Sequence, residues 1–291
     1  MNILKHVGRR VSCRRQTPFV YLGIHTPYEL LNASGDISLW VRKAVWMGHT
    51  ALGISDRNTM GATLALQKAC DKAGIRPVFG YTCTLSHDGE QAEVKIYCQS
   101  QRGLRNLLRI QKAVMVDAGD ATIQLPELLR RGEGNVLVLG KLSSFWMERN
   151  RHVVKVLQET FDRVFYQIDL SEYKAERLDA EVLKATSHFF NTFYDKAADR
   201  FLVEPVLIPD CHYPDRDDAR TKIVLNKIAT GAAHGQSDDQ YMKDVDELYE
   251  QFRNLFDGER WDIDALFKRV CRHTVEIAEG AEARYQTERN Y

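Results

Sequence analysis

Short apolar segments alternate with amphipathic ones along most of this 291-residue chain, and this alternation limits most strongly how it can fold. The apolar segments have the length and composition of buried strands; they cover residues 19–26, 51–55, 76–85, 93–99, 135–140, 164–169 and 202–209. Strands separated by helices or turns favour a mainly parallel sheet. About seven such strands favour a distorted α/β barrel over an open sheet.

Helices are expected in most of the intervals between these strands, because apolar residues recur there at helical spacing. They are predicted at 37–48, 60–73, 103–116, 125–131, 148–160, 173–200, 215–230, 244–256 and 263–279. Asp36 is placed to cap the first helix, and Gly74 to end the second. We therefore predict a flexible basic arm at 1–17, the barrel at 18–232, and a helical segment packed on it at 233–291.

The overall charge and the cysteines restrict the class of protein. Lys and Arg number 40, as do Asp and Glu, so no net field draws the chain to nucleic acid or membrane. The apolar runs are far shorter than the roughly 20 residues of a membrane span. The cysteines are scattered without a CxxC pair, which argues against a zinc ribbon or a disulfide framework and for a reducing cytoplasm.

Five cations stand close together near the N-terminus: Lys5, Arg9, Arg10, Arg14 and Arg15. The surrounding residues lack the apolar core of a secretory signal. This basic arm can contact phosphate groups of a nucleic acid, or it can be a solvated lead-in to the barrel. No Gly-rich phosphate loop and no recognisable nucleophile context occurs elsewhere in the sequence.

Polar residues follow several predicted strands, at the end of a barrel where chemistry is usually found. His25 follows the first strand, Asp56-Arg57 the second, and Asp210-Cys-His212 the last. Alternate strand residues share a face, so Asp210 and His212 form a candidate metal pair. With His25 they could form a three-ligand zinc or manganese site that keeps a position for water. The alternative is that each is a hydrogen-bonded structural residue.

These segments resemble the motifs of PHP domains (polymerase and histidinol phosphatase), in the version that begins the alpha subunit of bacterial DNA polymerase III. The resemblance covers residues 17–285. Residues 73–80, AGIRPVFG, are similar to the family's Ala-Gly-Ile-Lys-Pro-Ile-Ile-Gly, and 103–107 to its Gly-Tyr-x-Asn-Leu. Residues 240–242 and 273–278 look like the segments that end the family's PHP region. The resemblance implies a distorted (β/α)7-type PHP barrel with a helical C-terminal extension.

Matched to the family, the sequence keeps some metal ligands and lacks others. His25, Asp210 and His212 match ligand positions, and Glu93 falls near the place of a further histidine. The remaining motif positions form a vestigial pocket of Gly23, Asn32, Asp56, Arg57 and Thr82. Gly23 stands for a histidine, Asn32 for an aspartate, Arg57 for a histidine and Thr82 for a glutamate.

A cluster of ions needs several carboxylates and imidazoles to offset its charge, so at most one divalent ion is expected here and no catalytic residue is assigned. We predict that the Arg57 guanidinium replaces a lost cation and pairs with Asp210. The alternative is that Arg57 is an exposed loop residue.

The sequence is compatible with three functions. The resemblance implies a non-catalytic binding module that supports a polymerase or docks a proofreading exonuclease in DNA replication. The alternative is a metal-dependent phosphoesterase or 3′–5′ exonuclease with a reduced site at His25, Asp210 and His212. The third is a small-molecule or nucleotide binder in which Arg57 binds a phosphate. The chain ends at Tyr291 without a palm region, so this chain alone is not expected to polymerise DNA.

Overall fold

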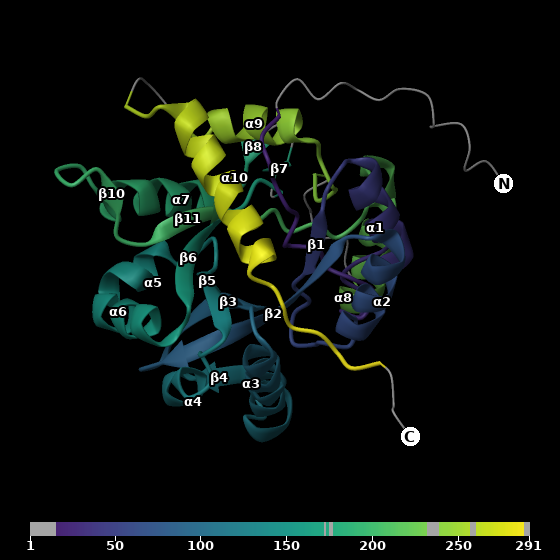
Figure 1. Ribbon diagram of the computed structural model, residues 1–291. Coiled ribbons are helices and arrows are strands. Elements are labelled where there is room, and N and C mark those ends of the chain that lie inside the picture. The colour runs from purple at the N-terminus through teal and green to yellow at the C-terminus, as the bar shows by residue number, and fades with distance from the viewer. Residues whose placement is uncertain (1–15, 172, 175–176, 232–238, 257–259, 288–291) are drawn as a thin grey trace.

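One seven-stranded sheet organises the computed structural model, which describes residues 16–171, 173–174, 177–231, 239–256 and 260–287 (Figure 1). Its strands are β1 (Ala51–Ile54), β2 (Arg76–His87), β3 (Glu90–Cys98), β4 (Thr122–Gln124), β5 (Asn135–Leu139), β6 (Arg163–Ile168) and β11 (Glu204–Leu207). The order is β1-β2-β3-β5-β6-β11, and β4 pairs with β2. The curled sheet, with helices around it, confirms the predicted α/β barrel.

The sheet is mixed, because β3 runs antiparallel to both of its neighbours. A tight turn at Asp88 and Gly89, both with positive φ, joins β2 directly to β3. The other pairs, β1–β2, β2–β4, β5–β6 and β6–β11, are parallel. The hairpin matters for the barrel mouth because β3 reaches it from the opposite direction to the parallel strands.

The predicted first strand, at 19–26, is an extended buried segment that forms β-bridges only at Ile24. It lies between the two edges of the sheet. The Ile24 N–H donates to the Gly53 carbonyl at 3.3 Å, and the His25 N–H donates to the Cys211 carbonyl at 2.8 Å. This segment therefore closes the sheet into a distorted barrel and carries His25 to its mouth.

Helices cover the sheet: α1 (Ile37–Trp46), α2 (Thr63–Ala73), α3 (Gln101–Lys112), α4 (Leu125–Leu129), α5 (Ser144–Arg149), α6 (Arg151–Thr160), α7 (Ala180–Thr192), α8 (Ala219–Thr230), α9 (Val245–Arg253) and α10 (Ile263–Glu279). Local sequence sets their ends. The Ser100 side chain accepts the Gly103 N–H at the start of α3, and Gly74 adopts the left-handed conformation after α2. A π-helical turn, Ala113–Asp117, continues α3.

The helix predicted at 173–200 is present, but its predicted length was wrong, because it covers only Ala180–Thr192. The structure has the short hairpin β7 (Tyr173–Lys174) and β8 (Arg177–Leu178), then α7, then the hairpin β9 (Tyr194–Asp195) and β10 (Arg200–Phe201). The Asp179 carboxylate accepts the N–H groups of Glu181 and Val182, which fixes the start of α7. The predicted helix at 148–160 is likewise divided at Asn150 into α5 and α6.

The C-terminal helices α9 and α10 follow the barrel, and α10 crosses the sheet beside β11 (Figure 1). His273 of α10 contacts the Pro205 carbonyl at 2.7 Å, and Arg269 forms an ion pair with Glu204. The predicted boundary at 232/233 and the basic arm, Lys5 to Arg15, lie outside the described residues. The three-part division of the chain therefore stays a prediction.

Two further findings bear on the environment of the protein. Among the described helices, none is long and apolar enough to cross a membrane. The thiols of Cys70, Cys83, Cys98, Cys211 and Cys271 are free and buried, as expected for cysteines that act as small core residues.

Candidate functional site

The candidate site is a buried polar cluster at the mouth of the barrel, and the chain reaches it from several strand ends. His25 ends the closing segment, Asp56 follows β1, and Lys141 follows β5. Asp169 follows β6, and Asp210 lies three residues beyond β11. Because parallel strands end at one edge of a sheet, these side chains meet. Lys95 joins them from within the antiparallel strand β3.

His25 is held between two carboxylates. Its Nδ1 lies 2.6 Å from Glu29 Oε2, and its Nε2 lies 2.8 Å from Asp210 Oδ1. A carboxylate only accepts, so both ring nitrogens donate and the ring is an imidazolium. Burial disfavours this charge, but Glu29 and Asp210 outweigh it and raise the pKa of His25 to about 9. In this state His25 has no lone pair to offer a metal ion.

Asp210 is the centre of the cluster. Its Oδ1 accepts from His25 and lies 2.8 Å from Lys95 Nζ, while its Oδ2 lies 3.4 Å from Lys141 Nζ. Gln167 Nε2 also donates to Oδ2, at 3.0 Å. Burial alone would raise the pKa of Asp210, but the two lysines and His25 hold it well below its usual range. The carboxylate is therefore ionised and surrounded by the protein's own cations.

Lys95 is an unusual residue for the interior of a barrel, since its side chain is only 1% exposed. It stands directly opposite Thr82 in the β2–β3 pairing. Its Nζ donates to Thr82 Oγ1 at 3.2 Å as well as pairing with Asp210. Thr82 Oγ1 in turn donates to the Ser55 carbonyl at 2.7 Å, so the ammonium has a built set of partners.

A second ammonium, that of Lys141, joins two carboxylates. It bonds to Asp169 Oδ2 as well as lying near Asp210. Asp169 Oδ1 accepts the main-chain N–H groups of Ser171, at 2.8 Å, and of Asp210, at 3.2 Å. Asp169 therefore both balances Lys141 and fixes the backbone that presents Asp210.

His212 differs from His25 in its protonation. Its Nδ1 lies 3.0 Å from the Asn32 carbonyl, so Nδ1 donates and Nε2 keeps its lone pair. Burial and the positive charges of His25 and Lys222 lower the pKa of His212 well below its ordinary value. The neutral ring stacks on His25 with centroids 4.2 Å apart and planes 9° from parallel.

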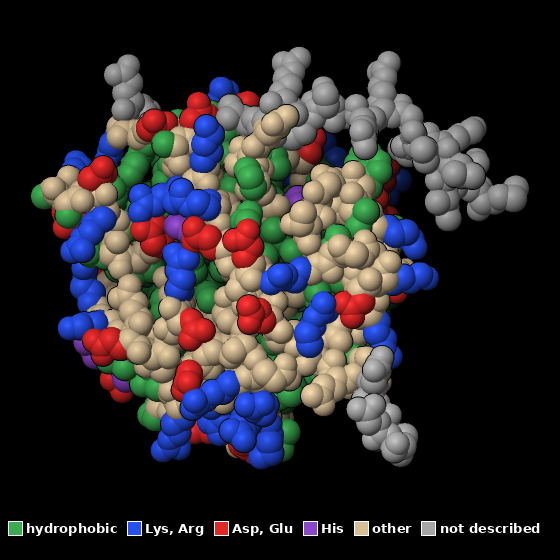
Figure 2. Space-filling view, viewed as in Figure 1, with side chains coloured by type: hydrophobic (Ala, Val, Ile, Leu, Met, Phe, Trp, Pro, Cys, Tyr) green, Lys and Arg blue, Asp and Glu red, His purple; other side chains and the backbone are tan. Residues whose placement is uncertain are grey.

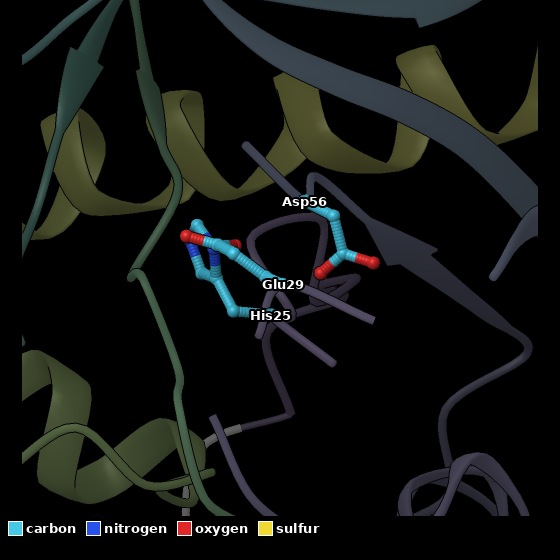
Figure 3. A group of neighbouring side chains, drawn as sticks. All are labelled: His25, Glu29 and Asp56. Carbon is cyan, nitrogen blue, oxygen red and sulfur yellow. The ribbon is translucent and has the colours of Figure 1, made fainter. Parts of the chain in front are cut away.

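His25, Glu29 and Asp56 form the group with metal-binding geometry, with ligand atoms all within 4.8 Å of one another (Figure 3). Figure 3 shows the Glu29 carboxylate beside the His25 ring, with Asp56 approaching from the end of β1. Asp56 Oδ1 and Oδ2 accept from the N–H and the hydroxyl of Thr26, each at 2.6 Å. Burial raises the pKa of Asp56 to about 6 despite these bonds.

The donors of this cluster do not fit a centre of two or three divalent ions. His25 has both nitrogens bonded, and Asp210 is already paired with Lys95, Lys141 and His25. A divalent ion beside these cations would meet repulsion in a region of low dielectric constant. The carboxylate oxygens of Glu29 and Asp56, which lie with His25 within 4.8 Å, are the groups left to bind a single ion.

The predicted pairing of Arg57 with Asp210 was wrong, because Arg57 forms its ion pair with Glu93. Residue 57 bridges to Thr82 at the β1 side of β2, and Glu93 lies close by on β3. The Arg57 side chain is 39% exposed, so it lies at the rim of the buried polar cluster. Lys95, two residues after Glu93 and on the same face of β3, takes the buried position.

The other predicted pocket residues lie around the same mouth. Asn32 Nδ2 donates to Glu29 Oε1, and Thr82 accepts from Lys95 as described. Gly23 lies against the last strand, where an added Cβ would overlap the Pro209 carbonyl oxygen. Residue 23 therefore cannot carry a side chain without displacing the backbone that leads to Asp210. Sequence reasoning brought His25, Asp210 and His212 together correctly in space; whether any of them binds metal stays a prediction.

Sequence reasoning missed four charged members of the cluster: Glu29, Lys95, Lys141 and Asp169. A signal for Lys95 was present in the sequence. Lys95 lies within the apolar run of β3, on the same face as Glu93 and Tyr97, because alternate strand residues share a face. Asp169 directly follows β6, and Lys141 follows β5 after one residue, so strand ends were the right places to inspect. Glu29 lies four residues after His25 in a turn, where no periodicity marks it.

Comparison with known proteins matches the chain to the PHP domain and to DNA polymerase III alpha subunits. The family model described as PHP domain matches residues 22–188. The chain is 28% identical over 151 residues to DNA polymerase III subunit alpha of Staphylococcus aureus (strain COL), covering 52% of this chain and 14% of that protein. It is 30% identical over 99 residues to the Bacillus subtilis (strain 168) subunit, covering 33% and 9%. The chain thus spans only a small part of these relatives.

A solved structure offers a weaker likeness. It is a two-domain protein from Bacteroides vulgatus containing a predicted PHP-like metal-dependent phosphoesterase, with 10% identity and a TM-score of 0.40. The match covers 94% of this chain and 72% of that one. This TM-score is too low to support any inference about the pocket.

Proposed function

The chain belongs to the PHP domain family, and on that premise we propose that it is a binding module of the DNA polymerase III alpha type whose pocket no longer performs metal-dependent hydrolysis. Its role is to hold other parts of a replication assembly together. Fold and chemistry separate readily in such domains, so a barrel can persist after its catalytic centre is lost.

The observation that carries the proposal is the buried ion pair between Lys95 and Asp210, 2.8 Å apart. Asp210 matches a family ligand position, and here an ammonium and an imidazolium already neutralise it. A second ammonium, that of Lys141, lies at its other oxygen. These internal cations stabilise the barrel mouth without an exchangeable ion, which suits a structural role.

The partners follow from the relatives as part of this proposal. The matched proteins are polymerase subunits, so we propose that this module contacts polymerase domains or a separate proofreading exonuclease. The buried free thiols support a reducing, cytoplasmic location. Contact of the basic arm at Lys5 to Arg15 with nucleic acid stays a further expectation.

Metal content and turnover test the proposal together. The full chain, purified and dialysed against buffer with 10 µM zinc or manganese, is measured by mass spectrometry and then assayed on a chromogenic phosphate ester and on labelled single-stranded DNA. We expect substoichiometric metal and no turnover. Stoichiometric metal, with hydrolysis that His212→Ala abolishes, would contradict the proposal.

The second candidate function is a single-ion phosphoesterase or 3′–5′ exonuclease, with the predicted ligands His25, Asp210 and His212. The grouping of His25, Glu29 and Asp56 within 4.8 Å favours it, because it offers carboxylates next to an imidazole. His25 can serve such an ion only after losing a proton. Metal binding by this route would therefore rise steeply as pH increases toward 9, which a metal titration at pH 6.5 and pH 9 can detect.

A further inference from the structure

A second surface of the molecule, away from the pocket, carries a concentration of positive charge although the chain as a whole is neutral. Figure 2 shows Lys and Arg side chains gathered at the lower edge of the molecule, over α3 and α4. We call this set the basic stripe; its members are Arg102, Arg105, Arg109, Lys112, Arg130 and Arg131. Figure 3 and the ligand positions described above involve none of these residues.

Helical spacing places the first part of the basic stripe on one face. Residues 102, 105, 109 and 112 are separated by three or four positions, so their side chains follow one line along α3 for about 15 Å. The opposite face of α3 carries the buried residues Leu104, Leu107 and Ile110. The stripe is therefore turned to solvent by the packing of the helix.

Arg130 and Arg131 both pair with Glu127, and the Arg131 side chain is only 23% exposed, so the cations most available to a partner lie on α3. Arg105 and Arg109 are exposed and form no ion pair within the part of the chain that the structure describes. Arg102 pairs with Glu133 at 2.6 Å, and Lys112 with Asp117 at 3.1 Å, but these side chains are more than half exposed. Exposed pairs contribute little to stability, so a partner's carboxylates can replace them.

Apolar side chains continue the same face. Leu108 is 41% exposed between the arginines, and Met115 and Val116 of the π-helical turn are 49% and 70% exposed. Arginine, methionine and exposed aliphatic groups together are typical of protein interfaces. Phosphate groups would use the charges but would leave these apolar side chains in water, whereas a protein segment can cover both.

We propose that the basic stripe, with Leu108, Met115 and Val116, is a docking surface for an acidic protein segment that presents apolar side chains from a helix. The carboxylates of the segment pair with Arg105 and Arg109, and its apolar side chains cover Met115 and Val116. The proposal deepens the binding role proposed above and rests on it, but the two can fail separately, because metal content does not depend on this surface.

The test measures binding of the full chain to a fluorescein-labelled peptide of three Leu-Glu-Glu-Leu-Glu-Glu-Glu repeats. Fluorescence anisotropy reports the binding at 50 and 200 mM salt. We expect binding that weakens about tenfold or more in Arg105→Glu/Arg109→Glu and about fivefold in Met115→Ser/Val116→Ser. Arg42→Glu/Lys68→Glu makes the same charge change on exposed positions of α1 and α2, and it should leave binding unchanged. Circular dichroism confirms that each variant is folded.

Several outcomes would overturn the docking surface. Failure of the peptide to bind, or equal weakening by the control pair, would remove its basis. A 20-base-pair DNA duplex serves as a second probe. If the duplex binds at 200 mM salt and responds only to Arg105→Glu/Arg109→Glu, the surface contacts phosphates and the proposed partner class is wrong.

Discussion

Replacing Lys95 by methionine tests the physical basis of the pocket, because it removes one charge and nearly preserves the shape of the side chain. Lys95 Nζ lies 2.8 Å from Asp210 Oδ1, and the two side chains are 1% and 6% exposed. At an effective dielectric constant of about 20, their Coulomb energy is about 6 kcal/mol. Loss of one partner from a buried pair costs about 3–5 kcal/mol, because the remaining charge stays buried. Since His25 and Lys141 still compensate Asp210, we expect a loss of about 3 kcal/mol.

Urea denaturation at pH 7, followed by circular dichroism, measures this loss. The double variant Lys95→Met/Asp210→Asn removes both charges, so it should be less destabilised than the sum of the single variants by about 2 kcal/mol. A loss below about 0.5 kcal/mol for Lys95→Met, with no coupling energy in the double-mutant cycle, would refute the reasoning. A loss that small is typical of a solvent-exposed ion pair.

The same pair explains why an ion should be excluded, and Lys95→Ala tests this by removing the ammonium and opening space. We expect 1 mM manganese or zinc to raise the thermal midpoint of Lys95→Ala and not that of the natural protein; binding at 100 times the dissociation constant contributes about 2.7 kcal/mol. Lys243→Ala is a matched control, because Lys243 is equally buried and pairs with Asp239 at 2.8 Å. It should be destabilised without gaining a response to metal. Absence of a response in Lys95→Ala would show that the ammonium does not decide metal affinity.

Three further changes have defined outcomes. The pKa of His25 is raised from 6.5 to about 9, so protonated His25 stabilises the folded protein fully below pH 6.5 and this contribution is lost as pH rises toward 9. We expect the free energy of unfolding to fall by about 3 kcal/mol over that interval, and by much less in His25→Gln. Gly103→Ala would ordinarily favour a helix by about 1 kcal/mol, but here the added Cβ overlaps the Gly134 carbonyl, so thermal denaturation should show a lower midpoint. Arg57→Ala should cost about 1 kcal/mol or less in urea, because its pair with Glu93 is partly exposed; a larger loss would place Arg57 inside the buried network.

The barrel was predictable because its strands are apolar runs of the right length, and a strand end reliably marks its mouth. This is why His25 and Asp210, separated by 185 positions, could be placed together. The strand register was not predictable from the sequence. Only the antiparallel pairing of β2 with β3 sets Lys95 against Thr82, and an isolated lysine in a strand usually faces solvent.

The error over Arg57 and Asp210 has the same origin. A cation was expected beside Asp210, and one is present, but it comes from β3 rather than from the loop after β1. Arg57 instead follows the bridge to Thr82 toward Glu93. Likewise, helical periodicity through 173–200 could not reveal that Asp179 would start a helix there and that short hairpins would flank it. Side-chain capping and pairing decide such boundaries, and periodicity does not report them.

The ammonium of Lys95 is attached to the chain, whereas a bound ion exchanges with the medium. Every copy of the protein therefore acquires this charge when it is synthesised, and neither metal starvation nor a chelator can take it away. Under the proposed function, the shape of the barrel mouth would not depend on the cell's metal supply. A part that must keep the same form under all growth conditions gains from such a permanent counter-charge.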